Sequence, residues 1–242
     1  MTVSVFRALH HGRAPGDPLV LPGPWDAASA RVFADAGFPA LATPSAGVAA
    51  SLGYEDGATP AAEMFAAVAR IVRAVPVPVS ADIEAGYGMP PKELVERLLD
   101  VGAVGCNLED SADGTLLDPQ RQADRLAEVR AVAGDDLFVN ARVDTYVRRV
   151  PDGTDPEAET ITRARLYAAA GADCVYPIAA PPESLPRLAA AVPVPLNALA
   201  LPDGPSPRRL GELGATRITF GPGQQRRAMA AVREMAERLH AD

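Results

Sequence analysis

The chain has 242 residues, of which 48% are hydrophobic and 22% charged, so it can build one large domain or two small ones. Its formal net charge is −8 at pH 7 and it contains no basic run, which argues against nucleic acid or an anionic membrane as a partner. No apolar run approaches the roughly 20 residues of a membrane span, and Met1 to Gly16 lack a signal peptide's apolar stretch, so we expect a cytoplasmic protein.

The two cysteines, Cys106 and Cys174, each lie within a short apolar run. Two such residues are too few for a disulfide framework or a zinc site, and this setting is typical of small core side chains.

Short apolar runs recur along the chain, and each is followed by a polar or glycine-containing turn and then by a longer segment with helical spacing. These runs predict eight strands, at residues 19–21, 40–42, 75–79, 104–108, 137–144, 174–176, 195–199 and 217–220.

The longer segments predict the helices. After a short leading helix at 6–10, they lie at 27–36, 63–75, 92–101, 119–133, 157–170, 183–191, 206–213 and 225–239. Asp26 is placed to cap the helix 27–36, and residues 43–60 are expected to form a looser connection. The last helix is expected to bury Met229, Val232, Met235 and Leu239.

Strands and helices that alternate in this way predict an α/β protein with a parallel sheet. Eight such units in roughly 250 residues match the size of a (β/α)8 TIM-type barrel. A doubly wound sheet is the competing architecture, but no G-x-G-x-x-G follows the first strand. Because no linker or shift in composition divides the chain, we predict a single barrel domain over residues 1–242, with a short helix at its start.

The strand at 75–79 leads into two carboxylates, Asp82 and Glu84, followed closely by Gly86 and Gly88. On a strand, residues two apart point to the same side of the pleat, so both acids are expected to face one site. Neighbouring carboxylates repel each other unless a cation or a shared proton intervenes, and oxygen ligands suit Mg²⁺ or Mn²⁺. An ordinary polar turn is the alternative interpretation.

Polar residues collect where the predicted strands end, which in a barrel is the catalytic end. They include Trp25 and Asp26, Ser45 to Gly47, Asn107 and Glu109, Asn140 and Arg142, and Asn197. Together, Asp82, Glu84 and Glu109 can attract a divalent metal, and Arg142 can bind a carboxylate or phosphate. This combination is typical of a metal enzyme for small acidic molecules.

Three of these features have structural alternatives. Glu109 and Asp110 could cap a helix, and Arg142 could form a structural ion pair with Asp144 or Glu84. The Gly-Pro-Gly at 221–223 could cradle a phosphate or simply form a tight turn.

Several motifs then resemble, in order, those of the isocitrate lyase/phosphoenolpyruvate mutase superfamily. They lie at residues 25–30, 36–40, 45–49, 51–53 with Asp56, 82–88, 108–110 and 140–142, within a span from about 18 to 223. The resemblance implies a barrel that forms or breaks a bond next to a 2-oxo acid with the help of Mg²⁺ (or Mn²⁺).

The resemblance also implies roles for individual residues. Asp82 matches the acid that binds the metal directly, and Asp56, Glu84 and Glu109 match acids that hold it through water. Ser45, Ala46 and Gly47 match a segment whose backbone N–H groups bind the substrate's carboxylate, and Arg142 matches an arginine that stabilises the developing charge. We therefore expect Arg142, Asp56 and Glu109 to be catalytic, and Trp25 and Asn197 to contribute to substrate binding.

The segment after the fourth strand departs from the lyase pattern. Isocitrate and methylisocitrate lyases carry K-K/R-C-G-H there, whereas residues 111–118 read Ser-Ala-Asp-Gly-Thr-Leu-Leu-Asp, without cysteine, lysine or histidine. This segment is also shorter than the gate of the enzymes that cleave phosphorus–carbon bonds.

Three functions follow as expectations. The first is a Mg²⁺-dependent carbon–carbon lyase or decarboxylase for a small 2-oxo or 2-hydroxy (di)carboxylic acid, acting through an enolpyruvate-like intermediate. The second is a phosphoenolpyruvate mutase or phosphonopyruvate hydrolase, and the third is an inactive barrel that binds metal and acid. By resemblance, we also expect a homo-oligomer, a dimer or a tetramer, with the last helix exchanged between subunits as one arrangement.

Overall fold

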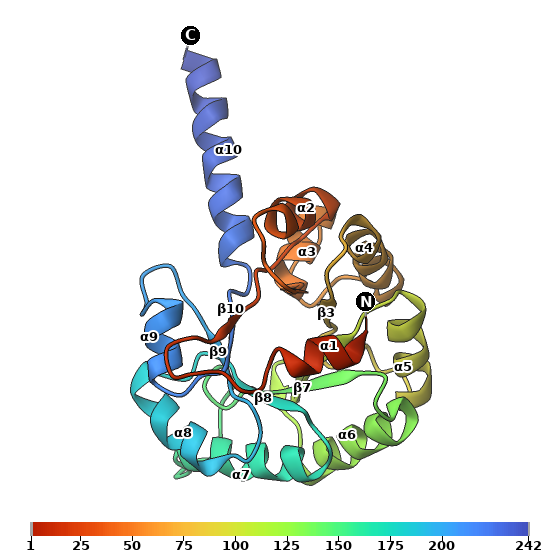
Figure 1. Ribbon diagram of the computed structural model, residues 1–242, viewed down its shortest axis with the longest axis vertical. Coiled ribbons are helices and arrows are strands. Elements are labelled where there is room, and N and C mark those ends of the chain that lie inside the picture. Colours follow the sequence, from red (N-terminus) through yellow and green to blue (C-terminus); the bar gives the residue numbers. More distant parts are fainter. Residues whose placement is uncertain (1, 242) are drawn as a thin grey trace.

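Eight parallel strands form a ring in the computed structural model, which describes residues 2–241 (Figure 1). The strands are β1 (Leu19–Val20), β2 (Leu41–Ala42), β3 (Val79–Asp82), β4 (Gly105–Glu109), β7 (Phe138–Val143), β8 (Cys174–Pro177), β9 (Asn197–Leu199) and β10 (Arg217–Thr219). They confirm the eight strands predicted from the sequence, with ends that differ by a few residues.

Two groups of paired strands form the ring, and a contact at each of the two junctions between them closes it. Pairing follows the orders β1–β10–β9 and β2–β3–β4–β7–β8, and a parallel bridge between Val175 and Leu196 connects β8 to β9. On the other side, the Ala42 N–H donates to the Pro22 carbonyl at 3.0 Å, next to β1. The architecture is therefore the predicted (β/α)8 TIM-type barrel.

The helices are named in chain order, and most of them surround the ring (Figure 1). They are α1 (Val3–Ala8), α2 (Ala27–Asp35), α3 (Ser45–Leu52), α4 (Ala61–Ala74), α5 (Pro91–Asp100), α6 (Pro119–Ala133), α7 (Pro156–Ala169), α8 (Leu185–Ala191), which follows a 3₁₀ turn at Pro182–Ser184, α9 (Pro207–Glu212) and α10 (Gly223–Ala241). Asp26 caps α2 as predicted, because its carboxylate accepts a hydrogen bond from the Ser29 N–H at 2.7 Å.

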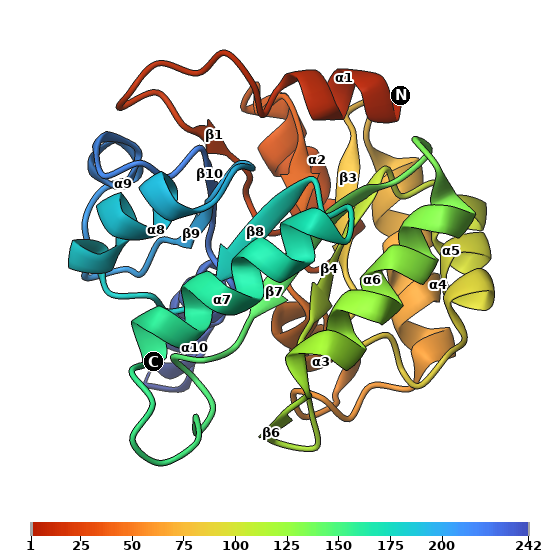
Figure 2. The ribbon, with the colours of Figure 1, turned by 90° about the horizontal axis from the view of Figure 1, so that it is seen from below.

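The barrel has two different ends. α1 lies at one end, and the hairpin β5 (Ser111–Ala112) and β6 (Thr115–Leu116) lies at the opposite end (Figure 2). α1 and the turn after it seal their end through Phe6 and His10, which are both buried against Phe138. The imidazole of His10 stacks on the Phe138 ring at 4.1 Å between centroids. The opposite end therefore carries the open site.

Two sequence predictions are wrong in detail. Residues 45–52 form the helix α3 instead of a loose connection; its residues are nearly all small or apolar and show no clear amphipathic pattern. In addition, β3 begins at Val79, so the residues predicted as this strand largely precede it and Asp82 is its last residue. Because the strand runs further along the chain, it carries Asp82 directly to the open end.

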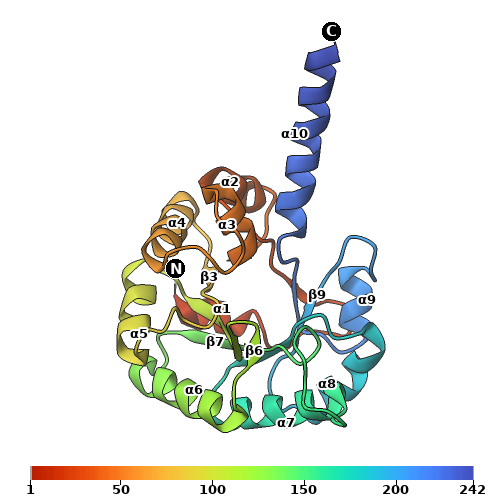
Figure 3. The same cartoon turned by 180° about the vertical axis from the view of Figure 1, so that it is seen from behind.

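The prediction that the last helix buries its apolar face is also wrong for a single chain. α10 projects away from the barrel (Figure 3), and its apolar side chains are exposed: Met229 by 49%, Val232 by 46%, Met235 by 51% and Leu239 by 79%. The helix does have the expected amphipathic spacing, but the barrel covers only its beginning, where Gln225 is buried.

Cys106 and Cys174 are buried and unpaired, as predicted. Across residues 2–241, no helix is both long enough and apolar enough to span a lipid bilayer.

Candidate active site

The carboxyl ends of the strands surround a cavity of about 220 Å³. A cavity of this size suits a small metabolite. Seven of the residues predicted for the site line it: Ser45, Ala46, Asp56, Asp82, Glu84, Glu109 and Arg142.

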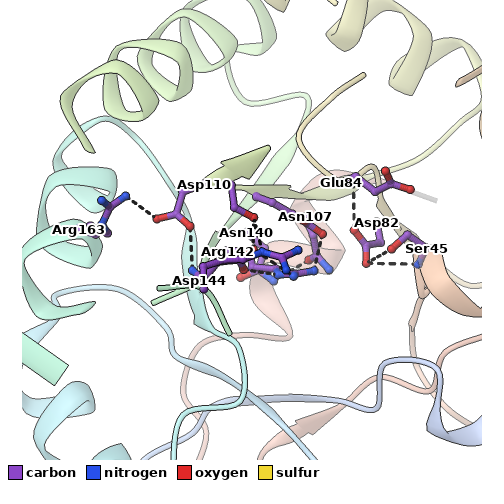
Figure 4. Close-up of polar contacts among 12 residues, drawn as sticks. Ser45, Asp82, Glu84, Asn107, Asp110, Asn140, Arg142, Asp144 and Arg163 are labelled. Carbon is purple, nitrogen blue, oxygen red and sulfur yellow. Dashed lines mark hydrogen bonds and ion pairs between the residues drawn. The ribbon is translucent and has the colours of Figure 1, made fainter. Parts of the chain in front are cut away.

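Asp82 lies at the end of β3 and is 8% exposed. Its Oδ2 accepts two hydrogen bonds from Ser45, one from the backbone N–H at 3.3 Å and one from the hydroxyl at 3.0 Å (Figure 4). Its own N–H donates to the Thr43 hydroxyl at 3.1 Å. Burial raises the pKa of Asp82, while nearby Arg142 and the bonds from Ser45 act in the opposite direction.

Glu84 reaches the same cavity by a different route from the one predicted. It lies beyond β3 in a left-handed conformation with φ of 52°, and its N–H donates to Asp82 Oδ1 at 3.3 Å. A tight turn, and not the alternation of a strand, therefore brings the two acids together. Burial and the charges of Asp82 and Asp56 raise the pKa of Glu84 to about 7.

Arg142 connects two other acids, of which Figure 4 labels Asp144. Its Nη1 donates to Glu109, and its Nε and Nη2 contact both carboxylate oxygens of Asp144, at 2.6 and 3.2 Å. Burial and repulsion from Asp82 raise the pKa of Glu109 to about 9, against the lowering effect of Arg142. Burial tends to lower the pKa of Arg142, but Glu109, Asp144 and Asp82 raise it above its usual range. Of the two ion pairs considered for Arg142, the structure contains the one with Asp144.

Asp110 supports this arrangement from outside the cavity. It is fully buried and accepts hydrogen bonds from the Asp144 N–H at 2.8 Å, the Tyr167 hydroxyl at 2.8 Å and Arg163 at 3.1 Å. It is therefore not a helix cap; Asp118 caps α6 instead. Sequence reasoning missed this network, because its members are far apart in the chain.

Three residues expected to bind substrate are not among those that line the cavity. Trp25 packs edge-on against Phe33, with 6.4 Å between ring centroids. Gly47 lies inside α3, close to Pro44, and Asn197 is buried and donates to the Thr219 hydroxyl at 3.2 Å. Thr219 itself lines the cavity, so Asn197 lies one layer behind the cavity wall.

A second polar layer lies beneath the acids inside the barrel. Asn107 Oδ1 accepts hydrogen bonds from Asn140 at 2.7 Å and from Arg217 at 3.4 Å. Arg217 is fully buried and forms no ion pair within residues 2–241. Sequence reasoning missed this arginine, because it begins its strand, whereas site residues were expected toward the carboxyl ends of the strands.

The donor set fits a divalent cation. Four acids line the cavity, and Glu84 Oε1 is buried without a hydrogen-bond partner in the part of the chain that the structure describes. Within residues 2–241, no three carboxylate, imidazole or thiol groups are arranged to ligate one ion directly. Such a donor set would suit a hard divalent ion that keeps several of its water ligands.

The connection after β4 is the segment that departs from the lyase pattern. It forms the short hairpin β5–β6, whose sequence contains no cysteine, lysine or histidine. Ser111 in this hairpin is buried and donates to the Asp144 carboxylate, so the hairpin also helps to hold Asp144 in place.

Comparison with known proteins gives a consistent picture. The sequence matches the phosphoenolpyruvate phosphomutase family over residues 6–240. It is 38% identical over 218 residues to an uncharacterized protein of Mycobacterium tuberculosis, covering 89% of this chain and 81% of that one.

Two solved structures share the fold. A "putative phosphonomutase" from Burkholderia cenocepacia superposes with a TM-score of 0.88 at 40% identity, covering 98% of this chain and 97% of the other. The structure of 2,3-dimethylmalate lyase, a member of the PEP mutase/isocitrate lyase superfamily, gives a TM-score of 0.85 at 29% identity, covering 100% and 89%.

Proposed function

The chain belongs to the phosphoenolpyruvate phosphomutase family of the isocitrate lyase/phosphoenolpyruvate mutase superfamily, and on that premise we propose that it is a Mg²⁺- or Mn²⁺-dependent carbon–carbon lyase or decarboxylase. Its substrate would be a small 2-oxo or 2-hydroxy dicarboxylic acid. One observation carries the proposal: Asp82, Glu84, Asp56 and Glu109 share a small cavity with an arginine and with the start of a helix.

The start of α3 supplies the binding site for the substrate's first carboxylate. α3 has no side-chain cap at Pro44, and the N–H groups of its first turn have no carbonyl partner inside the helix. Ser45 uses its N–H to hold Asp82, which leaves the N–H of Ala46, a residue that lines the cavity, for the substrate. The positive end of the helix dipole favours an anion at this position.

The charged side chains supply the rest of the chemistry. A divalent ion held by Asp82, with Asp56, Glu84 and Glu109 acting through water, would supply a Lewis acid for the oxygen anion that develops as the bond breaks. Arg142 places a fixed positive charge beside this position, and Asp144 and Glu109 hold its guanidinium in orientation. No histidine, cysteine or lysine lines the cavity within residues 2–241, so we propose that water supplies the proton to the product.

A reaction at a phosphorus–carbon bond is the second candidate. The matching family and the phosphonomutase likeness favour it, and it would use the same acids and Arg142. The short hairpin after β4 favours the first candidate, because it is small for a gate over the cavity.

A substrate panel distinguishes the two. Oxaloacetate, substituted malates, citramalate and phosphonopyruvate would each be incubated with Mg²⁺ or with chelator, and pyruvate, phosphoenolpyruvate and orthophosphate would be measured. Because Mg²⁺ alone promotes decarboxylation of oxaloacetate, the reference rates are those without enzyme and with Asp82→Ala. Metal-dependent pyruvate from a carbon substrate, lost in Asp82→Ala, supports the lyase; turnover of phosphonopyruvate alone supports the second candidate.

Silence across the panel would contradict both candidates. If Mg²⁺ still raised the melting temperature of the wild type and not of Asp82→Ala, a barrel that binds metal without turnover would be the better account.

We further propose a cytoplasmic homo-oligomer, a dimer or a tetramer, that takes neither nucleic acid nor a membrane as a partner. The exposed apolar face of α10 supports assembly, because Met229, Val232, Met235 and Leu239 lie along one side of a helix that the barrel does not cover. The net charge of −8 supports the exclusion of anionic partners.

A further inference from the structure

Two arginines line the cavity, and only one of them is neutralised by the protein. Arg142 is engaged by Glu109 and by both oxygens of Asp144. Arg148 forms no ion pair within residues 2–241. Its only side-chain hydrogen bond there runs from Nε to the Ser111 hydroxyl at 3.5 Å. Both terminal nitrogens of Arg148 are therefore available to a ligand.

The backbone holds Arg148 in place beside the cavity. β7 ends at Val143, and the next residues turn so that the N–H groups of Val147 and Arg148 donate to the Asp144 carbonyl at 2.9 and 2.8 Å. Asp144 is itself fixed by the buried Ser111 and by Asp110. The residue is exposed, but the start of its side chain is anchored to the end of a barrel strand.

The charges around the cavity indicate which substrate group Arg148 could bind. On the proposed function, the start of α3 would bind the first carboxylate, and a divalent ion held by the acids would bind the 2-oxo or 2-hydroxy group. A dicarboxylic acid brings a second carboxylate, and the remaining acids of the cavity would repel it. Arg142 already carries two carboxylates, whereas the guanidinium of Arg148 is free to form a bidentate pair with a third.

We propose that Arg148 is a specificity-determining residue that binds the second, distal carboxylate of the substrate. The inference rests on the proposed function, since it names the class of acid that the same site takes. It identifies the substrate as a dianion and gives the two arginines different roles. Arg142 acts beside the bond that breaks, and Arg148 recognises the distal carboxylate.

Binding tests this inference independently of turnover. Malate and 2-hydroxybutyrate have the same chain length and differ only in the distal group, a carboxylate in one and a methyl in the other. With Mg²⁺ present, calorimetric titration of the wild type should favour malate by about 10- to 100-fold, the range expected for a charge-assisted pair. Arg148→Gln should lose most of this preference, and Arg148→Lys should keep part of it.

Arg149→Gln is the matched control, because Arg149 is the next residue, pairs with the exposed Asp152 and does not line the cavity. It should keep the wild-type preference. With any substrate found active in the panel, Arg148→Gln should raise KM by about 10- to 100-fold and change kcat by less than about threefold, whereas a merely structural role would alter both.

The outcomes separate the two proposals. An unchanged preference for malate in Arg148→Gln, or no preference in the wild type, would overturn the role of Arg148 even if the enzyme cleaves a carbon substrate. A preference that depends on Arg148, together with silence across the panel, would support this binding role and count against the proposed reaction alone.

Discussion

Ser45 donates two hydrogen bonds to one carboxylate oxygen of Asp82, from its backbone N–H at 3.3 Å and its hydroxyl at 3.0 Å. The first residue of α3 thereby orients the acid that ends β3. Both bonds favour the charged form of Asp82, which burial disfavours.

Ser45→Ala should therefore weaken the site without unfolding the barrel. A hydrogen bond to a charged group contributes about 1.5–3 kcal/mol, so we expect kcat/KM to fall by about 10- to 100-fold. Ser51→Ala is the control on the same helix, because among residues 2–241 its hydroxyl bonds only to the carbonyls of Val48 and Trp25. Equal activities of the two variants would show that the bond to Asp82 is unimportant.

Removing Arg142 should cost stability as well as activity. Arg142→Met leaves Glu109 and the fully buried Asp144 without their cation, and the loss of one partner from a buried pair costs about 3–5 kcal/mol. Urea unfolding measures this change.

Two further variants check the cause of that loss. Arg149→Met breaks an exposed pair with Asp152 and should change the free energy of unfolding by less than about 1 kcal/mol. Adding Asp144→Asn to Arg142→Met should restore part of the stability. If the double variant is no more stable than Arg142→Met, an unpaired Asp144 is not the source of the loss.

His10 should make stability depend on pH. Burial and the charge of Arg217 lower the pKa of His10 to about 3, and its Nδ1 hydrogen-bonds to the Phe6 carbonyl at 2.8 Å. Between about pH 3 and the usual 6.5, the unfolded chain binds a proton that the folded chain does not. The contribution of His10 to the free energy of unfolding is therefore complete above pH 6.5. It decreases as the pH falls, and at pH 5 it is smaller by about 2 kcal/mol.

His10→Phe keeps an aromatic ring against Phe138 and removes the titration. The free-energy difference between wild type and variant should be constant from pH 7 to 8, and it should shift by about 2 kcal/mol in favour of the variant by pH 5. Parallel curves down to pH 5 would show that His10 is protonated in the folded protein.

The exposed face of α10 should control assembly. Val232→Lys with Met235→Lys places two charges on the apolar side of the helix, where both residues are about half exposed in the single chain. Analytical ultracentrifugation should show a smaller species than the wild type. Arg233→Gln changes another side of the same helix and should leave the mass unchanged. A wild type that sediments as a monomer would refute the proposed oligomer.

The sequence predicted the barrel well because its information is local and periodic. Each strand is an apolar run bounded by a turn, and each helix except α3 shows apolar spacing or a cap. α3 was missed because residues 45–52, Ser-Ala-Gly-Val-Ala-Ala-Ser-Leu, give almost no contrast between two faces. The exposure of α10 was missed because an amphipathic pattern shows that a face needs cover and does not show what covers it.

The site was predictable where it follows a strand end, and not elsewhere. Asp82, Glu109 and Arg142 occupy such ends, and they lie around one cavity. Arg148 lies five residues beyond its strand, and only the turn at Asp144 brings it back to the cavity. The catalytic and binding roles themselves stay predictions until the variants are measured.

The pairing of Leu19 with Arg217 has a consequence for how the protein folds. The ring closes only when its first and last strands meet, so the conformational entropy of closing a long loop is lost before the long-range contacts between these strands compensate for it. Until then the facing edges of β1 and β10 are unpaired and can pair with other chains. We expect the amides of β1 and β10 to be the last of the barrel to gain protection from hydrogen exchange during refolding, and dilution to improve the yield.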